Sequence, residues 1–253
     1  MKTNKYFFTV TIITLTIGLL ISPVHAVSKK MQKNQGFIGV QSGASGVIAN
    51  LPYEELSAEE ELGLIRMREE EKLARDVYAA LYDIWQKPVF RNISQSEQRH
   101  MNAVKVLIDK YELIDPVSDS TMGVFTDPEF SGLYESLVEQ GSASLVDALI
   151  VGATIEDLDI KDLRDFLAQT DNEDITAVYE NLLRGSRNHL RAFTYLLSLN
   201  GETYEAQYIT QEELEAIITS PRETGSRAGR TGTSRTGEAN AGTCDGTGEC
   251  VNL

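Results

Sequence analysis

Four long stretches of this chain repeat apolar residues at the spacing of one helix face, and each face is interrupted by an ionisable side chain. The second stretch shows the pattern in the series Ile93, Glu97, His100, Val104, Leu107 and Ile108. A carboxylate and an imidazole three residues apart on a helix have Cβ atoms about 5–6 Å apart, so Glu97 and His100 can bind one metal ion. Because a buried unpaired carboxylate costs several kcal/mol, Glu97 needs a partner or a metal ion from the other stretches.

Capping signals give the expected starts of the helices. A Ser, Thr or Asp followed three residues later by an acidic residue is typical of a helix N-terminus, and such pairs occur at Ser57–Glu60, Ser94–Glu97, Asp171–Asp174 and Thr210–Glu213. The sequence therefore predicts long helices over 57–85, 94–112, 144–169 and 171–200. It also predicts short helices after Asp127-Pro128 and after Thr210. Glu97 could then simply complete a capping box with Ser94, although this does not explain His100 on the same face.

The other three long helices each place one candidate metal ligand on their apolar face, namely Glu71, Glu156 and His189. Glu71 differs in this from Glu69 and Glu70, which we expect to be solvated. Glu156 lies in an acidic run, and periodicity alone equally allows a solvated face that contains Glu156, Asp157, Asp159 and Asp162. A single histidine on an apolar face is more often a hydrogen-bonded core residue than a ligand, so that alternative stays open for His189.

Charge and the N-terminal pattern limit the class of protein. A net charge of −15 over 253 residues argues against binding to nucleic acid phosphates or to an anionic membrane. Lys2 and Lys5 precede an uncharged apolar run and a Val24-His-Ala26 cleavage pattern, which predicts a signal peptide over 1–26. We therefore expect an exported protein, located in the periplasm, the cell envelope or the extracellular space, without a membrane span after cleavage. An uncleaved anchor is the alternative.

The remaining segments complete the expected domain organisation. Residues 27–50 read as a flexible lead-in, and 51–220 as one all-α domain, an antiparallel four-helix bundle with short extra helices. Residues 221–253 are rich in Gly, Thr, Ser and Arg, and we expect a disordered tail. The tail holds both cysteines, Cys244 and Cys250, and the sequence leaves open whether they form a disulfide.

Several motifs resemble a known superfamily. The stretch from Glu71 to Tyr78 (Glu-Lys-Leu-Ala-Arg-Asp-Val-Tyr) resembles the first-helix Glu-x-x-Ala-Arg-x-x-Tyr of ferritin-like proteins, rubrerythrins in particular. The span 56–218 resembles more closely an uncharacterised ferritin-like family, domain of unknown function 2202. The stretches that carry this resemblance are 68–78, 96–100, 123–126 and 183–193. The resemblance implies a ferritin-like bundle and brings no established activity.

The candidate ligands depart from a complete di-metal set at one position. Bundles that hold two metal ions use one Glu from each of two helices and a Glu-x-x-His pair from each of the other two. The matching residues here are Glu71, Glu97, His100, Glu156 and His189, whereas a second pair would need Glu where this chain has Ser186. Three interpretations stay open: a di-metal site in which water replaces the missing oxygen, a single metal ion, or a hydrogen-bonded core network without metal.

The expected function follows from these interpretations. Carboxylate and imidazole ligands favour iron or manganese, with zinc as an alternative. Iron or manganese would allow ferroxidase or peroxidase chemistry, and Tyr78, Tyr82 and Tyr179 are candidates to line the site, but the sequence identifies no catalytic residue. The alternative is a non-enzymatic interaction module with a vestigial metal site, or an envelope protein whose acidic surface and tail make the contacts. The sequence leaves the oligomeric state open, a homo-oligomer included.

Overall fold

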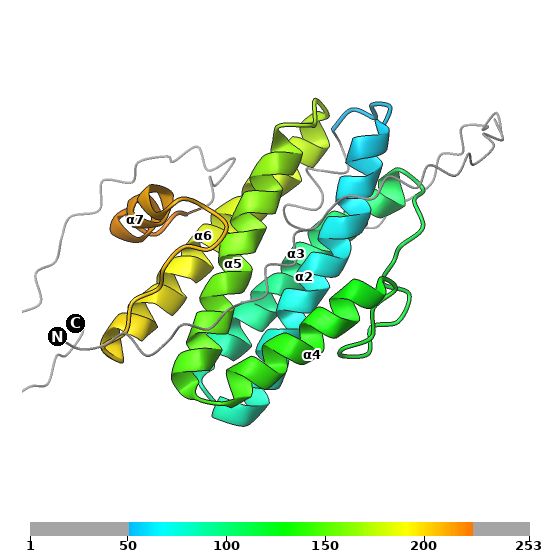
Figure 1. The fold of residues 1–253 in the computed structure, drawn as a ribbon. Coiled ribbons are helices and arrows are strands. Elements are labelled where there is room, and N and C mark those ends of the chain that lie inside the picture. The colour runs from blue at the N-terminus through cyan, green and yellow to red at the C-terminus, as the bar shows by residue number, and fades with distance from the viewer. Residues whose placement is uncertain (1–50, 225–253) are drawn as a thin grey trace, which may run out of the picture. The chain divides into compact units, whose positions relative to one another are not determined.

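The computed structural model describes residues 51–224, which contain six helices and no strand (Figure 1). The helices are α2 (Ala58–Trp85), α3 (Pro88–Lys110), α4 (Pro128–Ser142), α5 (Leu145–Leu167), α6 (Glu173–Leu199) and α7 (Gln211–Thr219). The expected all-α class is confirmed. The predicted signal peptide, the whole lead-in, and the tail from residue 225 with its two cysteines lie outside the described residues.

The four longest helices form two hairpins that pack against each other. Helices α2 and α3 are joined through Gln86 and Lys87, and α5 and α6 through residues 168–172, so each pair is antiparallel. Helix α2 also packs on α5, and α3 on α6, so all four surround one shared core (Figure 1). Helix α4 covers α2 and α5 from the side, and α7 packs on α6.

Three of the expected helix starts are confirmed. Ser57 and Glu60 form a reciprocal capping box at α2, and Thr210 and Glu213 form another at α7. Asp127 caps α4 through the amide of Glu129, with Pro128 in the first turn. Each cap satisfies backbone N–H groups that have no partner within the helix.

The predicted start of the second long helix was wrong. Helix α3 begins at Pro88, six residues before Ser94, because proline at the first position is already in helical conformation and lacks only an N–H that would be unpaired there. Ser94 therefore lies inside the helix, where its hydroxyl donates to the Arg75 carbonyl at 3.0 Å. Glu97 therefore cannot complete a capping box with Ser94. The burial of its carboxylate must have another cause.

The predicted cap of α6 was also wrong. Its N-cap is Asn172 rather than Asp171, and no side chain caps it. Asp174 is buried and accepts hydrogen bonds from the Tyr111 hydroxyl at 2.9 Å and from Lys110 Nζ at 2.6 Å. Its carboxylate therefore ties the end of α3 to the start of α6 instead of completing a capping box.

The middle of α2 is buried on every side, contrary to the expected solvated face. Glu69 accepts the backbone amides of Thr126 and Asp127 at 2.7 and 3.2 Å, which fixes the start of α4. Glu70 is buried beneath α4. Asp157 and Asp159 of α5 are buried as well, so the solvated-face interpretation of that acidic run is wrong for both.

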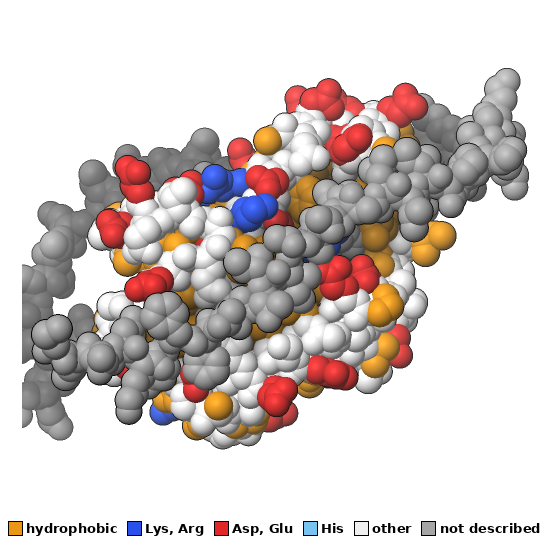
Figure 2. Space-filling view, viewed as in Figure 1, with side chains coloured by type: hydrophobic (Ala, Val, Ile, Leu, Met, Phe, Trp, Pro, Cys, Tyr) orange, Lys and Arg blue, Asp and Glu red, His pale blue; other side chains and the backbone are white. Residues whose placement is uncertain are grey.

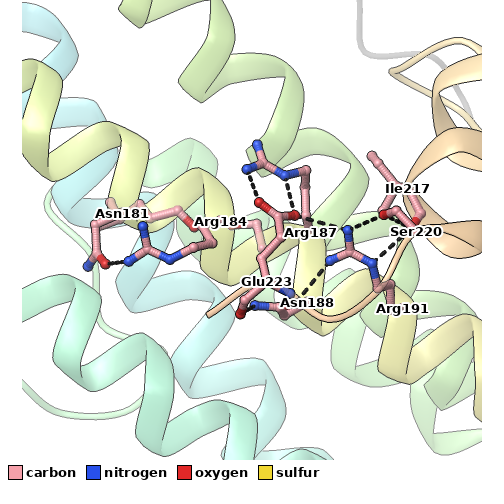
Figure 3. A network of polar contacts seen from close by, with 10 residues as sticks. Asn181, Arg184, Arg187, Asn188, Arg191, Ile217, Ser220 and Glu223 are labelled. Carbon is pink, nitrogen blue, oxygen red and sulfur yellow. Dashed lines mark hydrogen bonds and ion pairs between the residues drawn. The ribbon is translucent and has the colours of Figure 1, made fainter. Parts of the chain in front are cut away.

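The chain after α7 is fixed to the outer face of α6 by an arginine network (Figure 3). Glu223 accepts hydrogen bonds from Arg187 Nε at 2.7 Å and from Arg191 Nη2 at 2.9 Å. Asn188 and Ser220 add further contacts in the same network. Hydrogen bonds from Arg187 first, and then from Arg191, lower the pKa of Glu223 to about 2. The ordered contacts therefore continue three residues past the expected boundary at 220.

The surface reflects the acidic composition. Acidic side chains are spread over the face shown in Figure 2, with few lysines and arginines between them. None of the helices in residues 51–224 is long and apolar enough to cross a membrane.

An ion pair inside the protein holds the loop between α3 and α4 on α2. Lys72 is fully buried, and its Nζ donates to Asp76 Oδ2 at 2.5 Å and to the Thr121 carbonyl at 2.8 Å. The same Asp76 oxygen accepts the Gly123 amide at 3.1 Å. The ammonium also lies 4.3 Å from the centre of the Phe125 ring.

We predict that Asp76→Asn lowers the free energy of unfolding by about 3–5 kcal/mol, because it leaves the Lys72 ammonium buried without its counter-charge. Urea unfolding followed by circular dichroism measures the change. Asp109→Asn is the matched control, since it breaks an exposed pair with Lys105 and should cost less than about 1 kcal/mol. Equal, small losses in both variants would contradict the role given to the buried pair.

Candidate metal centre

Two groups of metal-ligating side chains meet between the two hairpins. The first consists of Glu71, Glu97 and His100, and the second of Glu97, Glu156 and His189. Within each group the ligand atoms lie within 4.8 Å of one another. The residues come from all four long helices, and Glu97 of α3 belongs to both groups.

Glu97 directs one oxygen to each histidine. Its Oε2 lies 2.6 Å from His100 Nδ1, and its Oε1 lies 2.8 Å from His189 Nδ1. The two imidazole rings are stacked with centroids 5.7 Å apart. A carboxylate placed between two nitrogen ligands in this way has the arrangement of a bridging ligand for two cations.

The outer carboxylates complete the two groups. Glu71 Oε2 accepts a hydrogen bond of 3.2 Å from His100 Nδ1, and Glu156 Oε2 lies 3.4 Å from His189 Nδ1. The Tyr78 hydroxyl donates to Glu156 Oε1 at 2.6 Å, which fixes the orientation of that carboxylate. Tyr78 is the one expected tyrosine that contacts a candidate ligand, because Tyr179 packs on Phe166 and Tyr82 on Arg91.

Glycine at position 185 makes room for His100. A Cβ atom at this position would lie 2.5 Å from His100 Cε1 and 2.6 Å from Nε2, which is closer than side chains pack. The imidazole therefore lies directly against the backbone of α6. This contact determines how His100 of α3 approaches the helix that carries His189.

Burial and mutual repulsion strongly shift the pKa values of the outer carboxylates. Burial raises the pKa of Glu71 to about 8, despite the opposing effect of His100. Burial also raises the pKa of Glu156, and the Glu97 charge adds to the shift while His189 opposes it. Asp159 lies one turn after Glu156 on α5, and burial together with the charges of Glu71 and Glu156 raises its pKa well above the usual range.

In His100, His189 and Glu97 the neighbouring charges outweigh burial and favour the ionised form of each side chain. Burial alone would lower the pKa of His189, but Glu97 and Glu156 more than offset it and raise the value to about 10. Glu71 and Glu97 likewise raise the pKa of His100. Burial of Glu97 is outweighed by His189 and His100, which hold its pKa well below the usual range. Without a cation, the centre therefore retains protons at neutral pH.

The structure brings together all five side chains that the sequence singles out as metal ligands. The sequence analysis missed Asp159 as a buried carboxylate that interacts with Glu71 and Glu156, because periodicity left it equally compatible with solvent. Ser186 is buried on α6, three residues before His189, and its hydroxyl donates to the Leu182 carbonyl at 3.2 Å. Its side chain is therefore bonded within its own helix.

The fold and this cluster define an all-helical protein with a buried site of carboxylates and imidazoles. Residues 60–221 match a family described as "Uncharacterized protein domain (DUF2202)", and the chain belongs to this family. It is 57% identical over 178 residues to the uncharacterized protein MJ0754 of Methanocaldococcus jannaschii, an alignment that covers 70% of this chain and 96% of the relative.

A solved structure is also similar. The crystal structure of the hypothetical protein MJ0754 superposes with a TM-score of 0.68 at 57% identity, covering 69% of this chain and 99% of the other. The expected membership of the uncharacterised family is therefore confirmed.

We predict that His189 stays protonated through pH 8 in the metal-free protein, and that His100 titrates well above the ordinary range of a histidine. The reason is that a pKa raised far above 6.5 keeps the imidazolium charged until the pH exceeds the shifted value. NMR titration of the imidazole C–H signals measures this directly. In Glu97→Gln the shared counter-charge is lost, so both pKa values should fall. Two histidines that titrate near pH 6.5 in the unaltered protein would contradict the described contacts.

Proposed function

We propose that this protein binds two transition-metal ions, iron or manganese, in the core of a ferritin-like antiparallel four-helix bundle formed by α2, α3, α5 and α6. The observation that carries the proposal is the position of Glu97, which belongs to both ligand groups and directs one oxygen to each histidine. Glu71, Glu97 and His100 would hold one ion. Glu97, Glu156 and His189 would hold the other.

Unpaired buried atoms support this fit. Glu71 Oε1, Glu97 Oε1, Glu156 Oε2 and His189 Nδ1 are buried without a hydrogen-bond partner among the described residues. Leaving such atoms unpaired costs free energy. Several of them lie close together without hydrogen-bonding geometry, as ligands of a common cation do.

The charge of the cluster supports the same number of ions. Glu71, Glu97, Glu156 and Asp159 supply four buried negative charges when ionised, while the two histidines are neutral as ligands. Two divalent cations would balance these four charges. Without metal ions, the same negative charges would have to be neutralised by several protons bound to the carboxylates and histidines at neutral pH.

The proposed role is metal handling or redox chemistry outside the cytoplasmic membrane. Iron or manganese would supply one-electron chemistry towards oxygen or peroxide. The protein would orient Glu156 through Tyr78 and keep bulk water from the ligands by burial. Ser186 favours a second candidate function, because a complete set of di-metal ligands would have a carboxylate at this position. In that case the protein would be an interaction module that retains the bundle without metal.

We predict different metal contents for single carboxylate variants. After anaerobic loading with Fe²⁺ or Mn²⁺ and removal of free metal, elemental analysis should give about two ions per chain in the unaltered protein. Glu71→Gln and Glu156→Gln should each retain about one ion, because each belongs to one group. Glu97→Gln should retain almost none, because both groups need it.

Glu180→Gln is the matched control, since it removes an exposed carboxylate from α6 and should leave the metal content unchanged. An absence of metal in the unaltered protein under every loading condition would favour the interaction module. Equal losses in all three ligand variants would argue against a shared Glu97. A single bound zinc would point to a structural site.

We also predict that metal binding releases protons and strengthens as the pH rises. With pKa values of about 8 for Glu71 and about 10 for His189, both groups carry a proton at pH 7 that an incoming cation must displace. The affinity should rise by about tenfold per pH unit for each displaced proton, up to the pKa of the group. Calorimetry between pH 6 and 8 in buffers of different ionisation enthalpy measures the released protons. An affinity independent of pH would contradict this reading of the cluster.

A further inference from the structure

A cavity of about 60 Å³ lies between α2, α4 and α5. Its lining runs from exposed side chains such as Glu129 and Tyr208 to the buried Glu70 and Asp159. The cavity therefore reaches from the surface towards the core. Apolar side chains of α4 and α5, Phe130 among them, form much of its wall.

Two buried carboxylates face this cavity with unpaired oxygens. Asp159 Oδ2 has no hydrogen-bond partner among the described residues, and Glu70 is held only by an ion pair between its Oε1 and Arg66. Each side chain is only about 4% exposed. Buried carboxylates of this kind need a cation, and a cavity beside them gives one room to bind.

A cationic group already occupies the outer side of the cavity. Arg66 Nε lies 2.8 Å from Glu70 Oε1, and Arg66 Nη2 lies 4.0 Å from Asp162 Oδ2. The guanidinium also lies 5.4 Å from the centre of the Phe130 ring. The cavity therefore already holds one positive charge, and the Arg66 side chain that carries it is partly exposed.

Both carboxylates are close in sequence to candidate ligands of the centre. Glu70 precedes Glu71 in α2, and Asp159 lies one helical turn after Glu156 in α5. The Asp159 carboxylate is close enough to Glu71 and Glu156 to interact electrostatically with both. Asp159 therefore lines the cavity and also interacts electrostatically with carboxylates of both ligand groups.

We propose that this cavity is the entry site for divalent metal ions, and that Glu70 and Asp159 bind each ion transiently on its way to the centre. The proposal rests on the proposed function of the centre. Oxygen ligands alone bind first-row divalent ions more weakly than a set that includes imidazole. An ion would therefore pass from Glu70 and Asp159 to the histidine-containing groups rather than stay in the cavity.

The test measures the rate of loading separately from the final metal content. The full-length metal-free protein is mixed with Co²⁺ in a stopped-flow instrument, and the visible absorption of the bound ion is followed. Glu70→Gln should slow loading by at least about tenfold, because an acidic cleft concentrates the cation. The final metal content should equal that of the unaltered protein. Arg66→Gln should speed loading, since the competing cation is gone.

Asp165→Asn is the matched control, because it removes an exposed carboxylate from the same helix as Asp159 and should leave the rate unchanged. A rate in Glu70→Gln equal to that of the control would overturn the entry site and leave the centre itself intact. A lower final metal content would also overturn it, since the residue would then be a permanent ligand. An absence of bound Co²⁺ in the unaltered protein would overturn the centre and the entry site together.

Discussion

The rest of this structure depends on one constraint, the burial of four interacting carboxylates between the long helices. These are Glu71, Glu97, Glu156 and Asp159. Removing such groups from water is costly unless positive charge replaces the lost hydration. The nearby cations of α2 do not supply it, because Arg68 pairs with Asp115 and Lys72 with Asp76. Among the described residues, the basic side chains in contact with Glu71, Glu97 and Glu156 are the two histidines. Two imidazolium charges would balance only part of the charge of four ionised carboxylates.

The same burial explains the unusual character of α2. A helix with an apolar face and a polar face normally packs on one side only. Helix α2 is covered by α3, α4 and α5, so its polar residues are also enclosed. Each position then has its own partner: Glu69 binds the start of α4, Lys72 holds the loop before it, and Glu71 faces the centre. The many charged residues of α2 are therefore explained by three separate sets of contacts.

Sequence reasoning found the five candidate ligands because helical spacing is a local property. Glu97 and His100 lie three residues apart, and that spacing places them on one face in any helix. The burial of Glu70 and Asp159 depends on α4, which comes from a distant part of the chain, so periodicity within one helix could not reveal it. The start of α3 was missed for a related reason: Pro88 both ends one helical pattern and begins the next.

The serine at position 186 has a different meaning once Asp159 is included. Judged against a six-ligand pattern, Ser186 removes one carboxylate and leaves the set incomplete. Judged by charge, Asp159 restores the total to four carboxylates, which two divalent ions would balance. A glutamate at position 186 would add a fifth negative charge to a site whose carboxylates already raise one another's pKa values. The serine, bonded within its own helix, is therefore compatible with a centre that takes its fourth carboxylate from α5.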